Sequence, residues 1–187
     1  MSVFGDERAT RYDRAMVRKS SMAPVGSDDA LLLVLGSLPG EASLAAQRYY
    51  ALPQNQFWRL LGSAVGEDLA TLPYDQRLAR LAARRIALWD VVGEAARTGS
   101  LDGAIRDATA NPLAEFVDTH PRLAAIAFNG QTAARLGRRA LGAAGERLRL
   151  IDLPSSSPAY TAAFEGKAAR WAQLGGLVSG GEAATLA

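Results

Sequence analysis

Four short, mostly apolar runs spread along the 187-residue chain constrain its fold more than any other feature. Apolar runs of this length are typical of strands that are buried on both faces of a sheet. Helix-like patterns separate them, and strands that alternate with helices indicate a parallel sheet covered on both sides. We therefore predict an α/β fold, a three-layer α/β/α domain with a four-stranded parallel sheet. The runs are Ala30–Leu35, Ile86–Val92, Leu123–Phe128 and Leu148–Leu153.

The helices between these strands are predicted from apolar periodicity and from capping residues. Asn111 before Pro112 has the pattern of a helix N-cap followed by proline at the first helical position. The expected helices span about residues 55–64, 74–83, 112–119, 130–141 and 161–174.

The length of the chain and its near-half content of apolar residues favour one domain, which we place at residues 30–176. Residues 1–29 mix charges, Ser, Gly and Pro without apolar periodicity, so we expect a flexible N-terminal arm there. Residues 177–187 are expected to form a flexible tail. No run reaches membrane-spanning length and the N-terminus has no secretory pattern, so we expect a cytoplasmic protein without membrane contact.

The composition excludes several classes of site. The chain has no cysteine, which rules out disulfides, a thiolate nucleophile, cysteine zinc sites and iron–sulfur clusters. We expect neither a metal nor another cofactor. The formal net charge is only +2 and identifies no partner by itself, although most of the basic residues are arginine, which suits phosphate contacts.

Ligands of open parallel sheets bind beyond the carboxyl ends of the strands, so the segments after the four runs are the places to look for function. The first of them, Gly36–Glu41, has neither the Gly-Lys-Ser/Thr ending of a triphosphate-binding loop nor a dinucleotide fingerprint. The other segments are Trp89-Asp90, Asn129-Gly130 and Leu153–Pro158, and all are rich in turn-forming residues.

Several polar residues have a structural interpretation beside a functional one. Asn55 is either an N-cap or a site residue, and Asp90 is either a turn cap or a site residue. Asn129 before Gly130 favours a helix cap over a ligand. His120, the only histidine, lies at the opposite end of its strand and is interpreted as structural. Its position and the lack of a Gly-x-Ser-x-Gly elbow count against a Ser-His-Asp hydrolase.

The segments together resemble, in order and spacing, the uracil-DNA glycosylase superfamily, and within it the hypoxanthine-DNA glycosylase branch. The resemblance covers roughly residues 30–171. Its motifs are Gly36-Ser-Leu-Pro-Gly40, Tyr49-Tyr-Ala-Leu-Pro-Gln-Asn-Gln-Phe-Trp58, Leu88-Trp-Asp-Val-Val92, Phe128-Asn-Gly130 and Leu153-Pro-Ser-Ser-Ser-Pro158.

The resemblance implies a role for each matched position. Asn55 would be the catalytic residue, because the loop position that carries Asp or Asn in other branches is Ser37 here, followed by Leu38. Tyr50 would stack on the extruded base and Asp90 would read it. The expected base-binding residues are Ser37, Leu38, Tyr50, Asp90 and Leu153. The expected DNA-binding residues are Gly40, Pro154, Ser155, Ser156, Ser157 and Tyr160.

The last motif departs from the family pattern. Leu153 stands where many relatives have His or Asn and cannot donate a hydrogen bond to a base, and Ser157 is too small for a strong wedge into the DNA. Tyr160 is a candidate to fill the vacated stack.

The implied activity is that of a monofunctional DNA glycosylase that flips hypoxanthine out of DNA and hydrolyses its N-glycosidic bond, leaving an abasic site. The matched loops contain no lysine for a Schiff-base lyase step. The expected partner is single- or double-stranded DNA with a deaminated base, bound by a monomer. Two alternatives stay open: a uracil- or xanthine-DNA glycosylase, and a non-catalytic nucleic-acid-binding relative.

Overall fold

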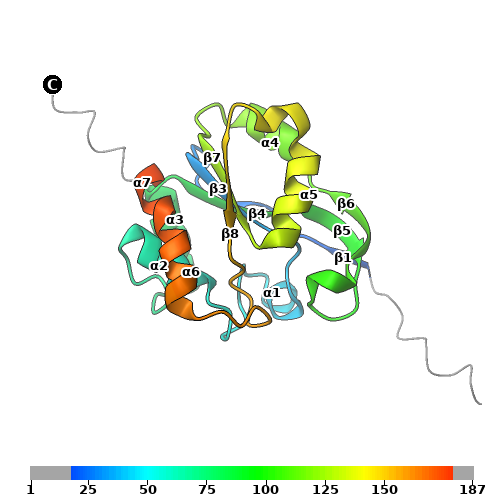
Figure 1. The fold of residues 1–187 in the computed structure, drawn as a ribbon, viewed down its shortest axis with the longest axis horizontal. Helices are drawn as coiled ribbons and strands as arrows, with labels where there is room; N and C mark the ends of the chain where they lie inside the picture. The colour runs from blue at the N-terminus through cyan, green and yellow to red at the C-terminus, as the bar shows by residue number, and fades with distance from the viewer. Residues whose placement is uncertain (1–17, 179–187) are drawn as a thin grey trace, which may run out of the picture.

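The computed structural model describes residues 18–178, which form a central sheet between two layers of helices (Figure 1). Strands β3, β4, β7 and β8 run parallel, and β2 pairs antiparallel with β4 at one edge. The α/β/α fold with four parallel strands is therefore confirmed, with a fifth, antiparallel strand added. The order across the sheet is β2 (Val25–Gly26), β4 (Ile86–Asp90), β3 (Leu32–Gly36), β7 (Ala125–Asn129) and β8 (Arg149–Leu153).

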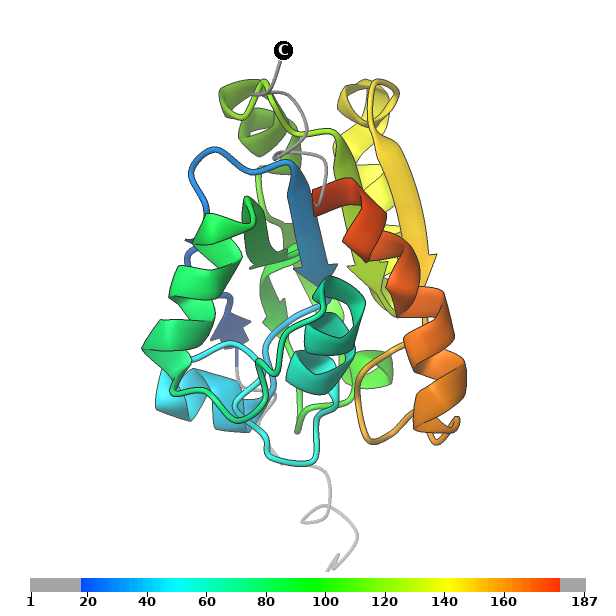
Figure 2. The same ribbon diagram turned by 90° about the vertical axis from the view of Figure 1, so that its left-hand side faces the viewer.

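The register of the parallel strands brings their carboxyl ends to one edge of the sheet. Gly36 of β3 pairs with Asp90 of β4, and Asn129 of β7 pairs with Leu153 of β8. In Figure 2 the arrowheads of these strands point the same way, toward the loops at the bottom of the view. This edge is where the sequence places the candidate site.

Helices cover both faces of the sheet (Figure 1). On one face lie α2 (Phe57–Val65), α3 (Tyr74–Ala83), α6 (Phe164–Trp171) and α7 (Gly175–Val178), and on the other lie α4 (Leu113–Thr119) and α5 (Gln131–Leu141). The short α1 (Glu41–Ala46) follows β3 below the carboxyl edge. The connections include three 3₁₀ turns: η1 (Asp102–Ala104), η2 (Gly142–Gly145) and η3 (Ala172–Leu174).

The predicted helices fold within a few residues of the expected bounds, because each has an apolar face for the sheet. In α2 this face includes Phe57, Leu60 and Leu61, all buried. Helix α5 approaches β7 closely at Gly137, where an added Cβ would lie 2.3 Å from the Phe128 ring. A larger residue at that position would push α5 away from the sheet.

A second, antiparallel sheet was not predicted. It consists of β1 (Arg18–Ser20), β5 (Val92–Ala96) and β6 (Arg106–Ala110), in the order β1-β5-β6. The predicted run 86–92 is split between the two sheets, because the chain leaves the parallel sheet after Asp90 and the Val92 N–H donates to the Ser37 carbonyl at 2.9 Å. Strand β6 is exposed throughout and has no apolar alternation that could have indicated it.

The structure corrects the expected N-terminal boundary at residue 29. Strands β1 and β2 belong to the two sheets, and the Met22 carbonyl accepts hydrogen bonds from Trp89 Nε1 at 2.9 Å and from the Tyr49 hydroxyl at 3.2 Å. The sequence suggested an arm because these strands are too short for periodicity. At the other end α7 extends to the buried Val178, and the remainder of the predicted arm and tail lies outside the described residues.

Within residues 18–178, no helix combines the length and apolar character that crossing a membrane would require.

Candidate active site

A cavity of about 560 Å³ opens at the carboxyl edge of the sheet. Its walls come from the ends of β3, β4 and β7, from the start of α1 and from four loops: β3 to α1, α1 to α2, β5 to β6, and β8 to α6. The predicted site residues that line it are Ser37, Leu38, Gly40, Tyr50, Asn55, Asp90, Ser155, Ser156, Ser157 and Tyr160. Most of the predicted site is therefore brought together in one place.

Two predicted residues do not line this cavity. Leu153 is buried in the main hydrophobic core, because the alternation of β8 turns its side chain inward. Pro154 lies against α6, and its carbonyl accepts a hydrogen bond from Trp171 Nε1 at 3.0 Å. The predicted base contact of Leu153 therefore does not fit the structure, whereas the DNA contact of Pro154, which is partly exposed, stays a prediction.

The carboxyl group of Asp90 lies at the inner end of the cavity, close to Gly36. A Cβ added to Gly36 would lie 2.5 Å from Asp90 Oδ1 and 3.1 Å from the Tyr50 hydroxyl, so only glycine leaves room for both groups. Asp90 Oδ2 accepts a hydrogen bond from the Ser21 hydroxyl at 2.9 Å. Ser21 follows β1, so the unexpected N-terminal strands help to form the site.

Burial raises the pKa of Asp90 to about 7. The hydrogen bonds from Ser21 and Tyr49 and the positive charge of Arg97 act in the opposite direction, whereas the negative charge of Asp102 adds to the rise. At neutral pH this carboxyl group is thus poised between a hydrogen-bond acceptor and a donor.

The Tyr50 ring is held from one face and at its hydroxyl. It stacks on Phe57 of α2, with 3.6 Å between ring centroids and 6° between planes. The Tyr50 hydroxyl accepts a hydrogen bond from Asn129 Nδ2 at 3.2 Å. Its φ of 53° is unusual for a bulky residue and turns the chain so that the ring reaches the cavity.

Asn129 links three segments of the site and does not cap a helix with its side chain, so the expected capping role is wrong. Gly130, with φ of 100°, occupies the N-cap of α5. Asn129 Oδ1 accepts from the Ser156 backbone N–H at 2.8 Å, and Nδ2 donates to the Ser156 hydroxyl at 2.8 Å. Asn129 therefore holds the loop after β8 against Tyr50.

Asn55 lies half-buried in the cavity wall just before α2. Its Oδ1 accepts a hydrogen bond from the Phe57 backbone N–H at 3.0 Å, although the N-cap of α2 is Gln56 and not Asn55. Among residues 18–178 its Nδ2 has no hydrogen-bond partner. One end of the amide is thus occupied by the helix while the other is available to a ligand.

The first loop is held by two residues of the connection between β5 and β6. Arg97, fully buried, donates to the carbonyls of Leu38 (3.1 Å) and Pro39. The Ser37 hydroxyl donates to Asp102 Oδ1 at 2.5 Å, and Asp102 lines the cavity. Neither Arg97 nor Asp102 was predicted, because nothing in the sequence near them indicates that β5 and β6 lie against this loop.

The loop after β8 is held by a residue of α6 on the side away from the cavity. Lys167, almost fully buried, donates from Nζ to the Tyr160 carbonyl at 2.6 Å and to Gln56 Oε1 at 2.9 Å. Burial lowers the pKa of Lys167. Lys167 is not part of the cavity wall.

His120 lies apart from the candidate site. His120 stacks on Phe116 with 3.8 Å between ring centroids and does not line the cavity. In residues 18–178, His, Asp and Glu side chains nowhere gather in a group of three or more that could hold a metal ion.

Comparisons with known proteins agree with these features. The family model described as the Uracil DNA glycosylase superfamily matches residues 23–175. A protein of Methanosarcina barkeri named hypoxanthine DNA glycosylase is 36% identical over 157 residues, which cover 84% of this chain and 98% of the relative. One of the same name from Methanosarcina acetivorans is 36% identical over 153 residues, covering 82% and 95%.

A solved structure shares the fold. It is a solution NMR structure of a candidate uracil DNA glycosylase from Methanosarcina acetivorans, with a TM-score of 0.75 and 34% identity. The match covers 86% of this chain and 99% of that one.

Proposed function

The chain belongs to the uracil-DNA glycosylase superfamily, and from that premise we propose that it excises hypoxanthine from DNA by hydrolysing the N-glycosidic bond, leaving an abasic site. The main observation in favour of this substrate is the composition of the cavity. It combines an aromatic ring, a buried carboxyl group and an amide with a free N–H₂ group in one recess beyond the parallel strands.

Tyr50 supplies the surface on which the flipped base stacks. Because Phe57 covers one face of its ring and Asn129 holds its hydroxyl, Tyr50 is fixed before the base arrives. Stacking on a fixed ring loses less side-chain entropy than stacking on a mobile one. This helps to offset the few kcal/mol, roughly, that unstacking a base costs.

Asp90 reads the edge of the base. Hypoxanthine carries a hydrogen on N1, which an ionised carboxylate accepts, whereas adenine presents a lone pair at N1, so that two hydrogen-bond acceptors would face each other. With its pKa near 7, Asp90 is largely ionised above neutral pH. This contact therefore favours the deaminated base over the normal one.

Asn55 acts on the reaction itself. Loss of the base leaves positive charge on the sugar and negative charge on the purine. The free Nδ2 of Asn55 is positioned to hold the attacking water or to donate to the departing base, and the first N–H groups of α2 lie beside it. An amide can hold water in this way without carrying charge into the cavity.

The rim of the cavity is the proposed contact surface for duplex DNA. In the described part of the chain the exposed large apolar side chains are Leu52 (39% exposed), Leu101 (63%) and Tyr160 (47%), and all three line the cavity. Apolar side chains gathered at one site mark a contact surface. We assign them to the bases beside the flipped nucleotide, with Leu101 and Tyr160 as candidates to fill the vacated stack.

This arrangement also supports a monomer, because the exposed large apolar side chains of residues 18–178 all line the cavity. A DNA substrate further supports the expectation of a cytoplasmic enzyme. Elution of the purified protein as a dimer in size-exclusion chromatography would contradict the monomer.

The deciding experiment incubates the protein with duplex oligonucleotides that carry a single inosine, uracil or xanthine, followed by alkaline cleavage at abasic sites. We expect strand cleavage at inosine and release of free hypoxanthine. Clear cleavage at uracil or xanthine without cleavage at inosine would contradict the substrate assignment.

A further inference from the structure

Hydrolysis of the glycosidic bond needs a group that takes a proton from water. The identity of that group is inferred here on the basis of the function proposed above. Asn55 cannot be that group, because an amide is not a base at neutral pH. Three carboxylates line the cavity: Glu41, Asp90 and Asp102. Their positions differ enough to separate their roles.

Glu41 lies at the outer part of the cavity and forms an ion pair with Lys19 Nζ at 2.6 Å. Its side chain is 62% exposed, so water competes for its charge. Asp90 lies at the inner end, at the end of β4, with one oxygen bound by Ser21 and the other close to Gly36. That position suits contact with the edge of a base better than contact with water beside the sugar.

Asp102 lies in the connection from β5 to β6, at the start of η1, and is half-buried in the cavity wall. Its Oδ1 accepts the hydrogen bond from Ser37, which orients the carboxylate. Among residues 18–178 its Oδ2 has no hydrogen-bond partner. One oxygen is thus anchored to the first loop and the other is left for water or substrate.

The surroundings of Asp102 make its carboxyl group more basic than an exposed one. Burial raises its pKa above the ordinary value, whereas the Ser37 hydrogen bond and the positive charge of Arg97 act against that rise. A carboxylate whose pKa is raised binds a proton more strongly, which suits a general base. Arg97 also holds the Leu38 carbonyl, so loop and carboxylate are fixed together.

We propose that Asp102 is the general base of the reaction. Its free Oδ2 accepts a proton from a water molecule while the oxygen of that water forms a bond to C1′ of the sugar. The C1′–N9 bond breaks, and its electron pair leaves with the purine. The purine then takes up a proton, and Asp102 returns its own to solvent, so the net change is the addition of one water.

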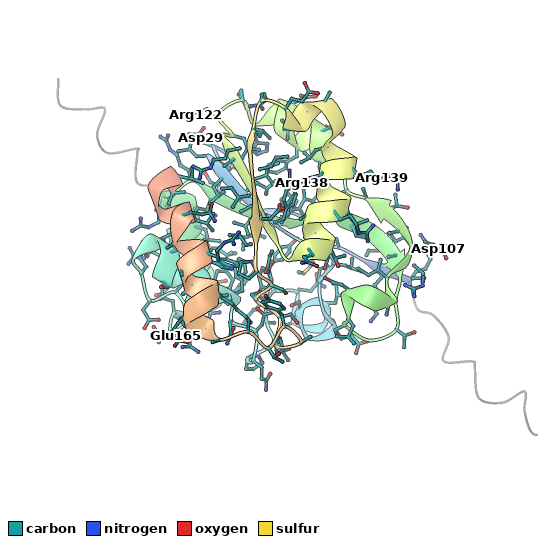
Figure 3. The ribbon with its side chains drawn as sticks, in the orientation of Figure 1. Asp29, Asp107, Arg122, Arg138, Arg139 and Glu165 are labelled. Carbon is teal, nitrogen blue, oxygen red and sulfur yellow. The ribbon has the colours of Figure 1, made fainter. Side chains whose placement is uncertain are left out.

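The matched test uses Asp102→Asn and Asp107→Asn. The first keeps an oxygen that can accept from Ser37 but removes the charge and the basicity. Asp107, in the exposed strand β6, serves as the control, since it does not line the cavity and lies at the outer edge of the domain (Figure 3). Its φ of 49° is one that asparagine tolerates.

We expect Asp102→Asn to lower the single-turnover excision rate on inosine DNA at least ~100-fold, with unchanged melting temperature and DNA affinity. Asp107→Asn should match the wild type. In Asp102→Ala, which leaves space at the site, added formate should restore part of the rate by supplying a carboxylate, and it should not do so in Asp102→Asn.

The outcomes separate this inference from the function on which it rests. A wild type that releases no hypoxanthine contradicts the proposed function and this inference with it. An active wild type with an equally active Asp102→Asn overturns the inference alone. An Asp102→Ala variant that is slow but unresponsive to formate also overturns it, because the residue would then act only by holding Ser37.

Discussion

The rings of Tyr50, in the loop before α2, and Phe57, at the start of that helix, lie nearly parallel with 3.6 Å between their centroids. Phe57 begins α2 and is fully buried, so the stack transmits the rigidity of the helix to the cavity wall. A base that enters the cavity meets a ring that is already in place.

Replacement of Tyr50 tests this stack. Stacking of a base on an aromatic side chain contributes about 1–3 kcal/mol, so Tyr50→Leu should lower excision roughly 5- to 150-fold. Tyr50→Phe is the matched control, because it keeps the ring and removes only the hydroxyl that accepts from Asn129. Single-turnover rates on inosine duplexes decide the matter. Equal rates for Tyr50→Leu and the wild type would show that the base stacks elsewhere.

Substitutions of Asn55 separate its contact with the helix from its contact with substrate. Asn55→Ala removes the acceptor for the Phe57 N–H, which costs about 1 kcal/mol and lowers the melting temperature by roughly 2–4 °C. Asn55→Asp keeps that acceptor but loses the free N–H₂ group. We expect both variants to lose at least ~100-fold in excision rate, and only the alanine variant to melt earlier.

DNA-binding measurements on the same variants supply the control. Affinity for inosine duplex should survive both substitutions, since the rim side chains are untouched. An Asn55→Asp variant with wild-type turnover would remove the Asn55 amide from the mechanism.

The buried carboxyl group of Asp90 predicts a pH dependence of stability. In the folded protein its pKa is about 7, whereas an unfolded Asp titrates near ~3.9. The folded state therefore binds more protons between these values, and the contribution of Asp90 to stability is fully present below pH ~4, declines up to about pH 7 and is constant above.

Melting temperatures at pH 5 and pH 8 test this contribution. The decrease in melting temperature from pH 5 to pH 8 should be smaller in Asp90→Asn than in the wild type, because the amide does not titrate. Asp107→Asn, at the exposed edge of β6, should fall as much as the wild type does. Identical falls in all three proteins would contradict the raised pKa of Asp90.

The rim predicts a difference between duplex and single-stranded substrates. If Leu101 occupies the space left by the flipped base, Leu101→Ala should slow excision from an inosine·cytosine pair more than excision from a single strand, where no stack must be held open. A tenfold difference corresponds to about 1.4 kcal/mol. An equal loss on both substrates would place Leu101 outside the stack.

The fold was largely predictable from local pattern. Runs such as Ala30–Leu35 are apolar because the strands are covered on both faces, and this property is local to each run. The second sheet was not predicted, because its strands lack such a local apolar pattern. Strands β5 and β6 contain few large apolar residues, and only their pairing with β1 and with each other makes them strands.

The site was predictable where a residue directly follows a buried strand or begins a helix, as with Ser37, Asp90 and Asn55. Leu153 was misplaced, because the direction of its side chain depends on its register in β8. The role of Asn129 was misjudged, because its partners, Tyr50 and Ser156, are distant in the sequence.

The sequence by itself determined which segments form the parallel sheet and which loops meet at its carboxyl edge, because burial and turn formation depend on residues close together in the chain. Only the tertiary structure decided which polar groups face one another there. The Ser37 hydroxyl and the Asp102 carboxylate are 65 positions apart, and Arg97 reaches the Leu38 carbonyl across 59. Hydrogen bonds over such separations follow from the packing of two sheets, which no local pattern encodes.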